Sequence, residues 1–366
     1  MLHALLTLIR KEFQALFSTS TNIRMLVMPV LLQLFLFPFA ATLEVKNSTL
    51  AIDNQDGGAA SVELVQRLAA TQAFPRVLML HGESRLQDTI DRQRALLVLR
   101  IPADFSRRLE RGEVATVQAL IDGRRSNSAQ IAFGYAQQVI TTYALERLHR
   151  PLPAQVALLN LYNPNLEYQW FVLPSLVAII TTIGCLMVTA LSLAREREEG
   201  TFEQLLVSPL TPAYIMAGKA IPGIVVAMGQ GTIILVAAIV FYHVPFSGSA
   251  LALYAAMICY GFALAGFGLL ISSLCNSQQQ AFLGVFTFMS PAVILSGYMA
   301  PVENMPAILR AVSAVDPVTH FIIVVKGVFL KGYGFAEAWP HMWPLLLIGS
   351  ATVLIAYILF RHRSGQ

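Results

Sequence analysis

The chain contains six apolar stretches of about the 20 residues that a helix needs to cross the hydrocarbon core of a bilayer. We place them at Met25–Leu43, Trp170–Ala194, Ala220–Tyr242, Ala250–Leu274, Ala281–Ala300 and Trp343–Phe360. Composition agrees, because 56% of the residues are hydrophobic and only 13% are charged. The mean hydropathy of +0.62 is also well above that of soluble domains. The sequence predicts a mainly α-helical membrane protein with six transmembrane helices.

The first 24 residues precede the first apolar stretch and have a helical pattern of their own. Apolar residues recur at helical spacing over residues 2–20, namely Leu5, Leu6, Ile9, Phe13, Leu16 and Phe17. We expect an interfacial helix, which is either a plain lead-in or an elbow that helps to bind a partner. A cleaved signal peptide is the competing interpretation of residues 25–43. Its apolar part is typically shorter, about 7 to 15 residues, which favours an uncleaved anchor.

Residues 44–169 contain no stretch that could cross a bilayer and are rich in charges, so we expect a separate α+β domain inserted between the first two spans. Its predicted strands are Thr49–Asp53, Ala95–Ile101 and Ala115–Ile121, and its predicted helices are Ala59–Ala73, Asp104–Glu110 and Ser128–Leu148. Its carboxylates show no catalytic pattern at Asp53, Asp56, Glu83, Asp104 or Asp122. A binding or gating module fits best.

Basic residues between the spans predict the orientation of the chain. Six crossings place both termini on one side, where the basic residues are Arg10, Lys11, Arg24, Arg195, Arg197, Lys219, Arg361 and Arg363. The short loops opposite contain only Arg310, Lys326 and Lys331. We expect cytoplasmic termini in a plasma membrane and an extracytoplasmic domain at residues 44–169, because long translocated domains escape the charge rule.

A dense charge run, SLAREREEGTFEQLLVSPLTP, follows the second span at residues 192–212. Gly200 and Thr201 offer a helix break and a new N-cap, and Pro209 and Pro212 would end a short second helix. Phe202, Leu205 and Leu206 would give that helix one apolar side. A solvated helix end is the plain interpretation. A docking segment over residues 195–219, fixed under the membrane, is the functional one.

Two other regions carry weaker signals. Residues 303–331 are amphipathic and broken by Pro317 and Gly327, which predicts helices that dip into the outer leaflet. Gly229, Gly231, Gly261, Ala265, Gly266 and Gly268 predict close helix contacts. As residues of a translocation path we select Gln33 in the first span and Pro291, Ser296 and Gly297 in the fifth.

Several kinds of chemistry lack a pattern in this sequence. No GxxxxGK(S/T) phosphate loop occurs, so we expect no ATP hydrolysis by this chain alone and no bound cofactor. Cys185, Cys259 and Cys275 have no zinc-site spacing, and we expect no metal. The net charge of +4 comes without a basic stripe interleaved with aromatics, so we expect no nucleic-acid partner.

The run REREEGTFEQLLVSPLTP after the second span resembles the cytoplasmic coupling segment of type-2 ABC export permeases. The stretch MAPVENMPAILRAVSAVDPVTHFI and the order of the spans also resemble this family. In the outer domain, LRIPADFSRRLERGEVATVQALIDG resembles members with large extracytoplasmic domains. The resemblance implies a non-catalytic transport subunit in a bacterial inner membrane that exports hydrophobic, lipid-like or drug molecules. It implies a second, identical or related six-span subunit.

The resemblance also implies a separate ATP-binding subunit, which would bind ATP and magnesium. A periplasmic adaptor is a further candidate partner. The residues that would contact the ATPase, or support that contact, are Glu196, Glu198, Glu199, Gly200, Thr201, Glu203, Leu205, Leu206 and Pro209.

Two alternatives from other functional classes stay open at the level of the sequence. A membrane sensor could bind a ligand with its outer domain, although the predicted cytoplasmic parts are short for a signalling output. An ion-coupled carrier is the other alternative. It generally needs ionisable groups inside its spans, and none of the six predicted spans has one well inside.

Overall fold

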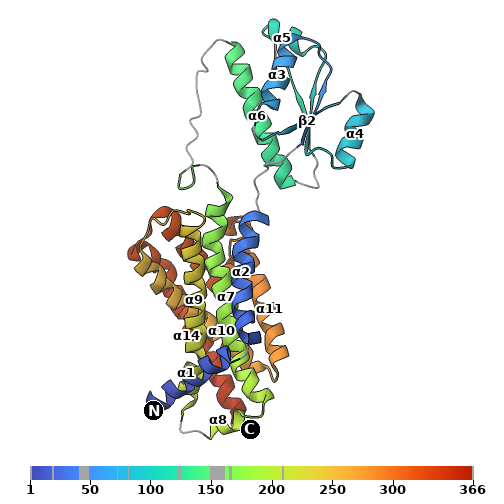
Figure 1. The fold of residues 1–366 in the computed structure, drawn as a ribbon. Coiled ribbons are helices and arrows are strands. Elements are labelled where there is room, and N and C mark those ends of the chain that lie inside the picture. Colours follow the sequence, from blue (N-terminus) through green and yellow to red (C-terminus); the bar gives the residue numbers. More distant parts are fainter. Residues whose placement is uncertain are drawn as a thin grey trace. The chain divides into compact units, whose positions relative to one another are not determined.

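The computed structural model describes residues 2–18, 20–40, 49–71, 73–80, 82–121, 126–148, 161–164, 167–207 and 210–364. Contacts divide the chain into two compact units. One unit, here called the helical unit, comprises residues 1–41 and 160–366. The other, the sheet unit, comprises residues 42–159. Figure 1 shows the elements of each.

The helical unit contains ten described α-helices. They are α1 (Leu2–Phe17), α2 (Ser20–Ala40), α7 (Tyr168–Glu198), α8 (Phe202–Leu206), α9 (Pro212–Val240), α10 (Ala250–Leu274), α11 (Gln278–Leu295), α12 (Ala307–Ala314), α13 (Pro317–Lys326) and α14 (Phe335–Ser364). A short 3₁₀ helix occupies Val302–Asn304, and a π-helical turn occupies Gly327–Lys331. Within this unit, α1 and α8 lie at the same end as the last turn of α14 (Figure 1). We call this the α8 end.

Four described helices are long and apolar enough to cross a membrane: α7, α9, α10 and residues 335–362 of α14. A fifth crossing would be formed by α12 and residues 317–331 if they were one span, but they meet at a bend of 77°. The apolar part of α2 covers Leu26–Phe39 only, and α11 begins with three glutamines. The protein is therefore a mainly helical membrane protein with four or five apolar spans, and the count of six stays a prediction.

The fifth predicted stretch differs most from the observed helix. We expected Ala281–Ala300 to be one span, with Ser296 and Gly297 inside it, but α11 ends at Leu295. Gly297 has a φ of +80°, outside the range of an α-helix, and the Ser296 hydroxyl donates to the carbonyl oxygen of Val293 at 2.8 Å. Ser296 and Gly297 thus form the turn after α11. The break that we predicted at Pro317 is confirmed, because α13 begins there.

Helix α7 lies at the centre of the helical unit and packs against α2, α9, α10, α11 and α13. Almost every side chain from Val172 to Ala194 is buried, although the stretch contains Ser175, Thr181, Thr182 and Thr189. These hydroxyls donate to carbonyl oxygens one turn earlier, for example Thr189 to Cys185 at 2.7 Å. Hydrogen bonding within the helix satisfies these polar groups, so they can be buried among apolar neighbours.

Small residues allow the central helices to approach closely. A Cβ atom at Gly231, Gly261, Gly266 or Gly268 would lie too near a side chain of another helix, and at Gly268 that side chain is Thr189 of α7. Gly229 differs, because a Cβ atom there would meet nothing within 4 Å. The predicted packing role is confirmed for Gly231, Gly261, Gly266 and Gly268, and it is wrong for Gly229.

The described residues of the sheet unit form a sheet of four strands in the order β2-β1-β3-β4. The strands are β1 (Thr49–Asn54), β2 (Arg76–Leu80), β3 (Leu97–Ile101) and β4 (Gln118–Ile121), and the helices are α3 (Ala59–Ala69), α4 (Glu83–Asp91), α5 (Phe105–Glu110) and α6 (Ser126–Leu148). β1 pairs in parallel with β2 and β3, and β4 runs antiparallel to β3. Strands and helices alternate along the described part of this unit, and the helices pack on a small mixed sheet in which only β4 is antiparallel.

Two elements of this unit, β2 and α4, were not predicted from the sequence. β2 lies at an edge of the sheet and its first four residues are exposed or half-buried, so it lacks the apolar pattern of a core strand. In contrast, β1 is buried on both faces. Leu50 and Ile52 pack with residues of α3 and α6, while Ala51 packs with Leu86 of α4 on the other side.

Two carboxylates of the sheet unit hold its loops in place. Asp53 is 2% exposed and accepts hydrogen bonds from Arg100 Nε at 3.2 Å and Gln55 Nε2 at 2.9 Å. Asp56 accepts from the backbone N–H of Ser106 at 3.0 Å and from the Ser106 hydroxyl. Partial burial acts to raise the pKa of Asp56, but these hydrogen bonds hold it below the usual value. Both side chains therefore stabilise the loop after β1.

We expect Gly268→Val to destabilise the helical unit, because the added methyl groups would push α10 away from Thr189 and the backbone of α7. Overpacking of this kind costs about 1–3 kcal/mol. Gly229→Val is the matched control, since that position is open. Thermal unfolding in detergent can be followed with a thiol-reactive dye, because Cys185 and Cys259 are buried. Equal unfolding temperatures for the two variants would contradict the close packing of α7 and α10.

Candidate functional site

Helix α1 presents a buried face that carries one acidic side chain. Leu8 and Leu16 are buried and lie on the same face as Glu12, since residues four apart are neighbours on a helix. This face packs against α9, where a Cβ atom at Gly218 would lie 2.9 Å from Leu8 Cγ. Glu12 itself is only 5% exposed. A carboxylate at such a position must have charged or hydrogen-bonding partners.

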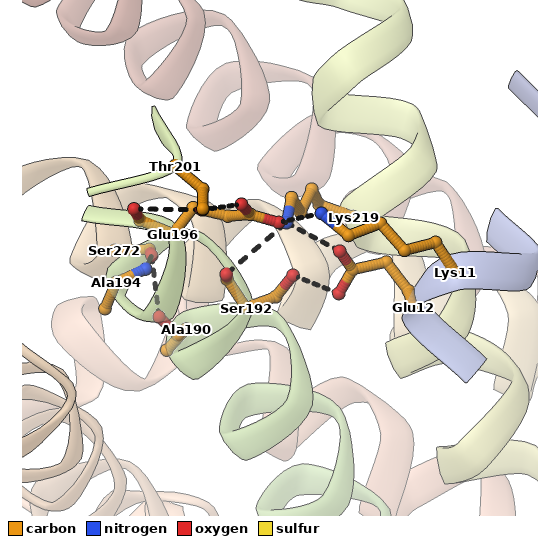
Figure 2. Close-up of polar contacts among 9 residues, drawn as sticks. All are labelled: Lys11, Glu12, Ala190, Ser192, Ala194, Glu196, Thr201, Lys219 and Ser272. Carbon is orange, nitrogen blue, oxygen red and sulfur yellow. Dashed lines mark hydrogen bonds and ion pairs between the residues drawn. The ribbon is translucent and has the colours of Figure 1, made fainter. Parts of the chain in front are cut away.

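Lys219 of α9 is the main partner of that carboxylate. Its side chain is 1% exposed, and its Nζ lies 2.6 Å from Glu12 Oε1 and 2.9 Å from Glu196 Oε1 of α7. The same Nζ lies 3.4 Å from the carbonyl oxygen of Ser192. One buried ammonium group therefore joins α1, α7 and α9, as Figure 2 shows.

The remaining oxygens of the two carboxylates are also occupied. The Ser192 hydroxyl donates to Glu12 Oε2 at 2.6 Å, and the Thr201 hydroxyl donates to Glu196 Oε2. Lys11 of α1 adds a second cation, with its Nζ 2.8 Å from Glu196 Oε1 (Figure 2). Two cations thus balance two anions. Burial of ion pairs costs desolvation energy, which is offset only when the geometry and additional hydrogen bonds are good, as they are here.

A second set of contacts attaches α7 to α10. The Ser272 hydroxyl of α10 donates to the carbonyl oxygen of Ala190 at 2.6 Å and accepts from the N–H of Ala194 at 3.1 Å. A regular helix would join these two backbone groups directly, so Ser272 inserts at a defined turn of α7 (Figure 2). Arg197 Nη1 donates to the carbonyl oxygens of Ser272, Ser273 and Cys275 at 2.7–3.2 Å. It satisfies the carbonyls that the end of α10 leaves unpaired.

At Gly200 the chain turns from α7 towards α8. Gly200 has a φ of +71°, a conformation that residues with a Cβ atom rarely adopt. Phe202 of α8 lies under the Arg197 guanidinium, which is 4.9 Å from the ring centroid, and packs edge-on against Phe360 of α14 at 5.6 Å. Phe202 and Leu205 belong to an apolar cluster with residues of α7, α9, α10 and α14. The predicted short helix with an apolar side is confirmed for these two residues.

The residues that we predicted to couple the permease to an ATPase differ in how deeply they are buried. Glu196 is buried in the ion network, and Thr201 and Leu205 are half-buried. Glu198, Glu199, Gly200 and Glu203 are exposed. Glu198 Oε2 also accepts from the backbone N–H of Gln278 at 2.8 Å, at the start of α11. The side chain of Leu206 and all of Pro209 lie outside the described residues.

Sequence reasoning missed the residues that hold this end of the protein together. Glu12 was not singled out in residues 2–20, although its spacing of four from Leu8 and from Leu16 places it on the buried face. Lys219 was interpreted as a flanking positive charge, and Ser192 and Ser272 carried no signal. The spacing within α1 could have identified Glu12, but its partners come from residues about 180 to 207 positions away.

An apolar cavity of about 1030 Å³ lies between α1, α2, α7 and α11. Its lining residues are Leu16, Arg24, Leu26, Met28, Pro29, Leu32, Gln33, Ile183, Met187, Val188, Leu191, Arg195, Gln278, Gln279, Phe282, Phe286 and Met289. Of the four residues predicted for a translocation path, Gln33 lines this cavity. Pro291 is exposed on α11, and Ser296 and Gly297 lie in the turn that follows it. In the described part of the chain, no group of three or more His, Cys, Asp or Glu side chains could hold a metal ion.

Comparison with known proteins identifies the family. The family model described as ABC-2 family transporter protein matches residues 20–358. The chain belongs to this ABC-2 family. It is the permease part of an ABC transporter, as the coupling-segment resemblance predicted.

Individual relatives agree with this family. The ABC-2 permease is 51% identical to the probable multidrug ABC transporter permease YbhR of Escherichia coli strain K12, over 99% of this chain and 100% of the relative. It is 29% identical to the inner membrane transport permease YhhJ of the same strain, over 86% of each chain. It is also 25% identical to ABC transporter G family member 20 of Dictyostelium discoideum, over 53% of this chain and 27% of that protein.

In this ABC-2 permease we expect Lys219→Met to lower the free energy of unfolding by about 3–5 kcal/mol, because it leaves two buried carboxylates with one partly exposed cation. Adding Glu12→Gln restores the charge balance and should recover part of the loss. Lys11→Met is the matched control and should cost about 1 kcal/mol or less, since the Lys11 side chain is 56% exposed. Detergent unfolding curves measure all three. Equal stabilities of Lys219→Met and Lys11→Met would show that the buried network contributes nothing.

Proposed function

We propose that this permease is the membrane subunit of an ATP-driven exporter that moves hydrophobic, lipid-like or drug molecules out of the cytoplasm or inner leaflet. A separate ATP-binding subunit would supply the energy by docking on the segment around α8. The names of YbhR, a probable multidrug permease, and YhhJ, an inner membrane transport permease, support the substrate class and the membrane.

The observation that carries this proposal is the attachment of α8 to the ends of several spans. Glu196 and Lys219 join α7 to α1 and α9, and Arg197 joins α7 to the end of α10. A force on α8 from a partner would therefore act on four helices together. Such a connection suits a subunit in which nucleotide-driven closure of the partner must move the spans as rigid elements.

The surface of the α8 end supplies the contact for the partner. Glu199 and Glu203 are exposed, and neither carboxylate has a hydrogen-bond or ion-pair partner among the described residues. Unpaired exposed charges steer association and fix the register of a docked protein. The rigid network beneath them would keep these carboxylates at fixed positions.

Orientation and assembly follow from the same proposal. The α8 end, with α1 and the last turn of α14, would face the cytoplasm, which agrees with its basic residues. The sheet unit would then be extracytoplasmic. Many side chains of α2 and α11 outside the cavity lining are exposed and apolar, including Phe35, Phe39 and Leu283, which suits contact with lipid and with a second permease subunit.

We expect the double variant Glu199→Lys/Glu203→Lys to bind the ATP-binding subunit about tenfold more weakly, because two exposed charges at the contact are reversed. Insertion into the membrane should not change, since both side chains are exposed at the α8 end. The matched control is Glu113→Lys, an exposed carboxylate in the sheet unit. The measurement is co-purification from native membranes, quantified against the permease. If the double variant retains as much ATPase as the control, the docking site lies elsewhere.

A further inference from the structure

The apolar cavity of the helical unit has its charged groups at one end. Arg24 and Arg195 line it near the start of α2 and the end of α7, which both lie at the α8 end. Gln278 and Gln279 from the first turn of α11 lie at the same end. The residues from the inner turns of these helices are apolar, with Gln33 as the exception. The cavity is therefore amphipathic along its length.

The side chains of Arg24 and Arg195 can bind an anion. Within the described chain, the Arg195 guanidinium has no hydrogen-bond or ion-pair partner. Arg24 donates from Nε to the carbonyl oxygen of Ser20 at 3.1 Å, which leaves its terminal nitrogens for other acceptors. None of the described residues that line the cavity is acidic. Two guanidinium groups without carboxylates at the mouth of an apolar space are suited to a carboxylate, sulfate or phosphate group.

The nearest acidic groups do not neutralise this end. A smaller cavity of about 360 Å³ shares Arg195 and is lined by Glu12, Glu196 and Glu199. Glu12 and Glu196 are bound to Lys219 and Lys11, as described above. Glu199 is exposed and forms no ion pair with Arg195. Arg195 therefore remains available on the side of the larger cavity.

We propose that the large cavity binds a small amphiphile with an anionic head, which Arg24 and Arg195 hold, and an apolar body, which extends along α2, α7 and α11. This inference rests on the proposed export function and names the substrate class of that path. The volume is at the upper end of the range of about 300–1,000 Å³ found for sites of drug-sized ligands. Gln33 Oε1 is buried and has no donor in the described chain, so a ligand hydroxyl or amide group would find an acceptor there.

The test compares three fluorescent probes that differ only in the head group. They are a dansyl-labelled long-chain fatty acid, its neutral methyl ester and the cationic amine of the same chain length. The full permease is placed in nanodiscs of zwitterionic phosphatidylcholine, and empty discs give the background. Binding of each probe is measured by fluorescence titration.

We expect the anionic probe to bind about tenfold more tightly than the ester, a typical effect of charge-assisted hydrogen bonds. The double variant Arg24→Gln/Arg195→Gln should lose this preference and bind the ester as before. Arg24→Glu/Arg195→Glu should prefer the cationic probe. Arg10→Gln is the matched control, because Arg10 is an exposed cation of α1 outside the cavity lining.

Three results would overturn the assignment: equal affinities for the anion and the ester, an equal loss of preference in Arg10→Gln, or complete displacement of the anion when phosphatidylglycerol replaces part of the disc lipid. The last result would identify a site for anionic bilayer lipid. The variant Met187→Trp fills part of the cavity with a larger side chain. It distinguishes a wrong assignment of the head group from a failure of the proposed export path. If Met187→Trp removes ester binding while no anion preference exists, the cavity remains a path for apolar molecules and the head-group assignment alone is wrong.

Discussion

The structure of the α8 end depends on the burial of one ammonium group, that of Lys219, between two carboxylates. Glu12 and Glu196 lie 2.6 and 2.9 Å from it, and each carboxylate has a further hydroxyl donor. Because an unpaired charge is very costly in such an environment, the network forms only when α1, α7 and α9 are in correct register. A polar cluster of this kind gives the contact a single geometry, which apolar packing alone would specify less strictly.

This fixed geometry matters for a permease because α8 is short and cannot transmit movement by itself. Its five residues are connected to α7 through Gly200, and Phe202 packs between Arg197 and Phe360. Movement of a docked partner would therefore reach α7 and α14 through side-chain contacts, and would reach α1 and α9 through Lys219. The apolar cavity lies beside the same ends of α2 and α7, so a change at the α8 end would also change the position of Arg195.

The sequence predicted the features that depend on local patterns. The apolar stretches of α7, α9 and α10, the break at Gly200 and the apolar side of α8 all follow from composition and spacing within a few residues. What it missed depends on contacts between distant residues. Lys219 has the sequence signal of an ordinary flanking cation, and Glu12 that of a polar helix surface. Likewise β2 is an exposed edge strand, recognisable only from its pairing with β1. The turn at Ser296 and Gly297 was hidden because apolar residues lie on both sides of it.

The measurement that tests the central claim most directly is the number of molecules transported per ATP hydrolysed by the reconstituted transporter. It compares the unmodified permease with Lys219→Met/Glu12→Gln, a variant in which charge is balanced but the ion pairs that join α9 to α1 and α7 are lost. If the network transmits movement from α8 to the spans, the variant continues to hydrolyse ATP while transport per ATP falls several-fold. An unchanged ratio in a folded, ATPase-bound variant would show that the network only stabilises the fold.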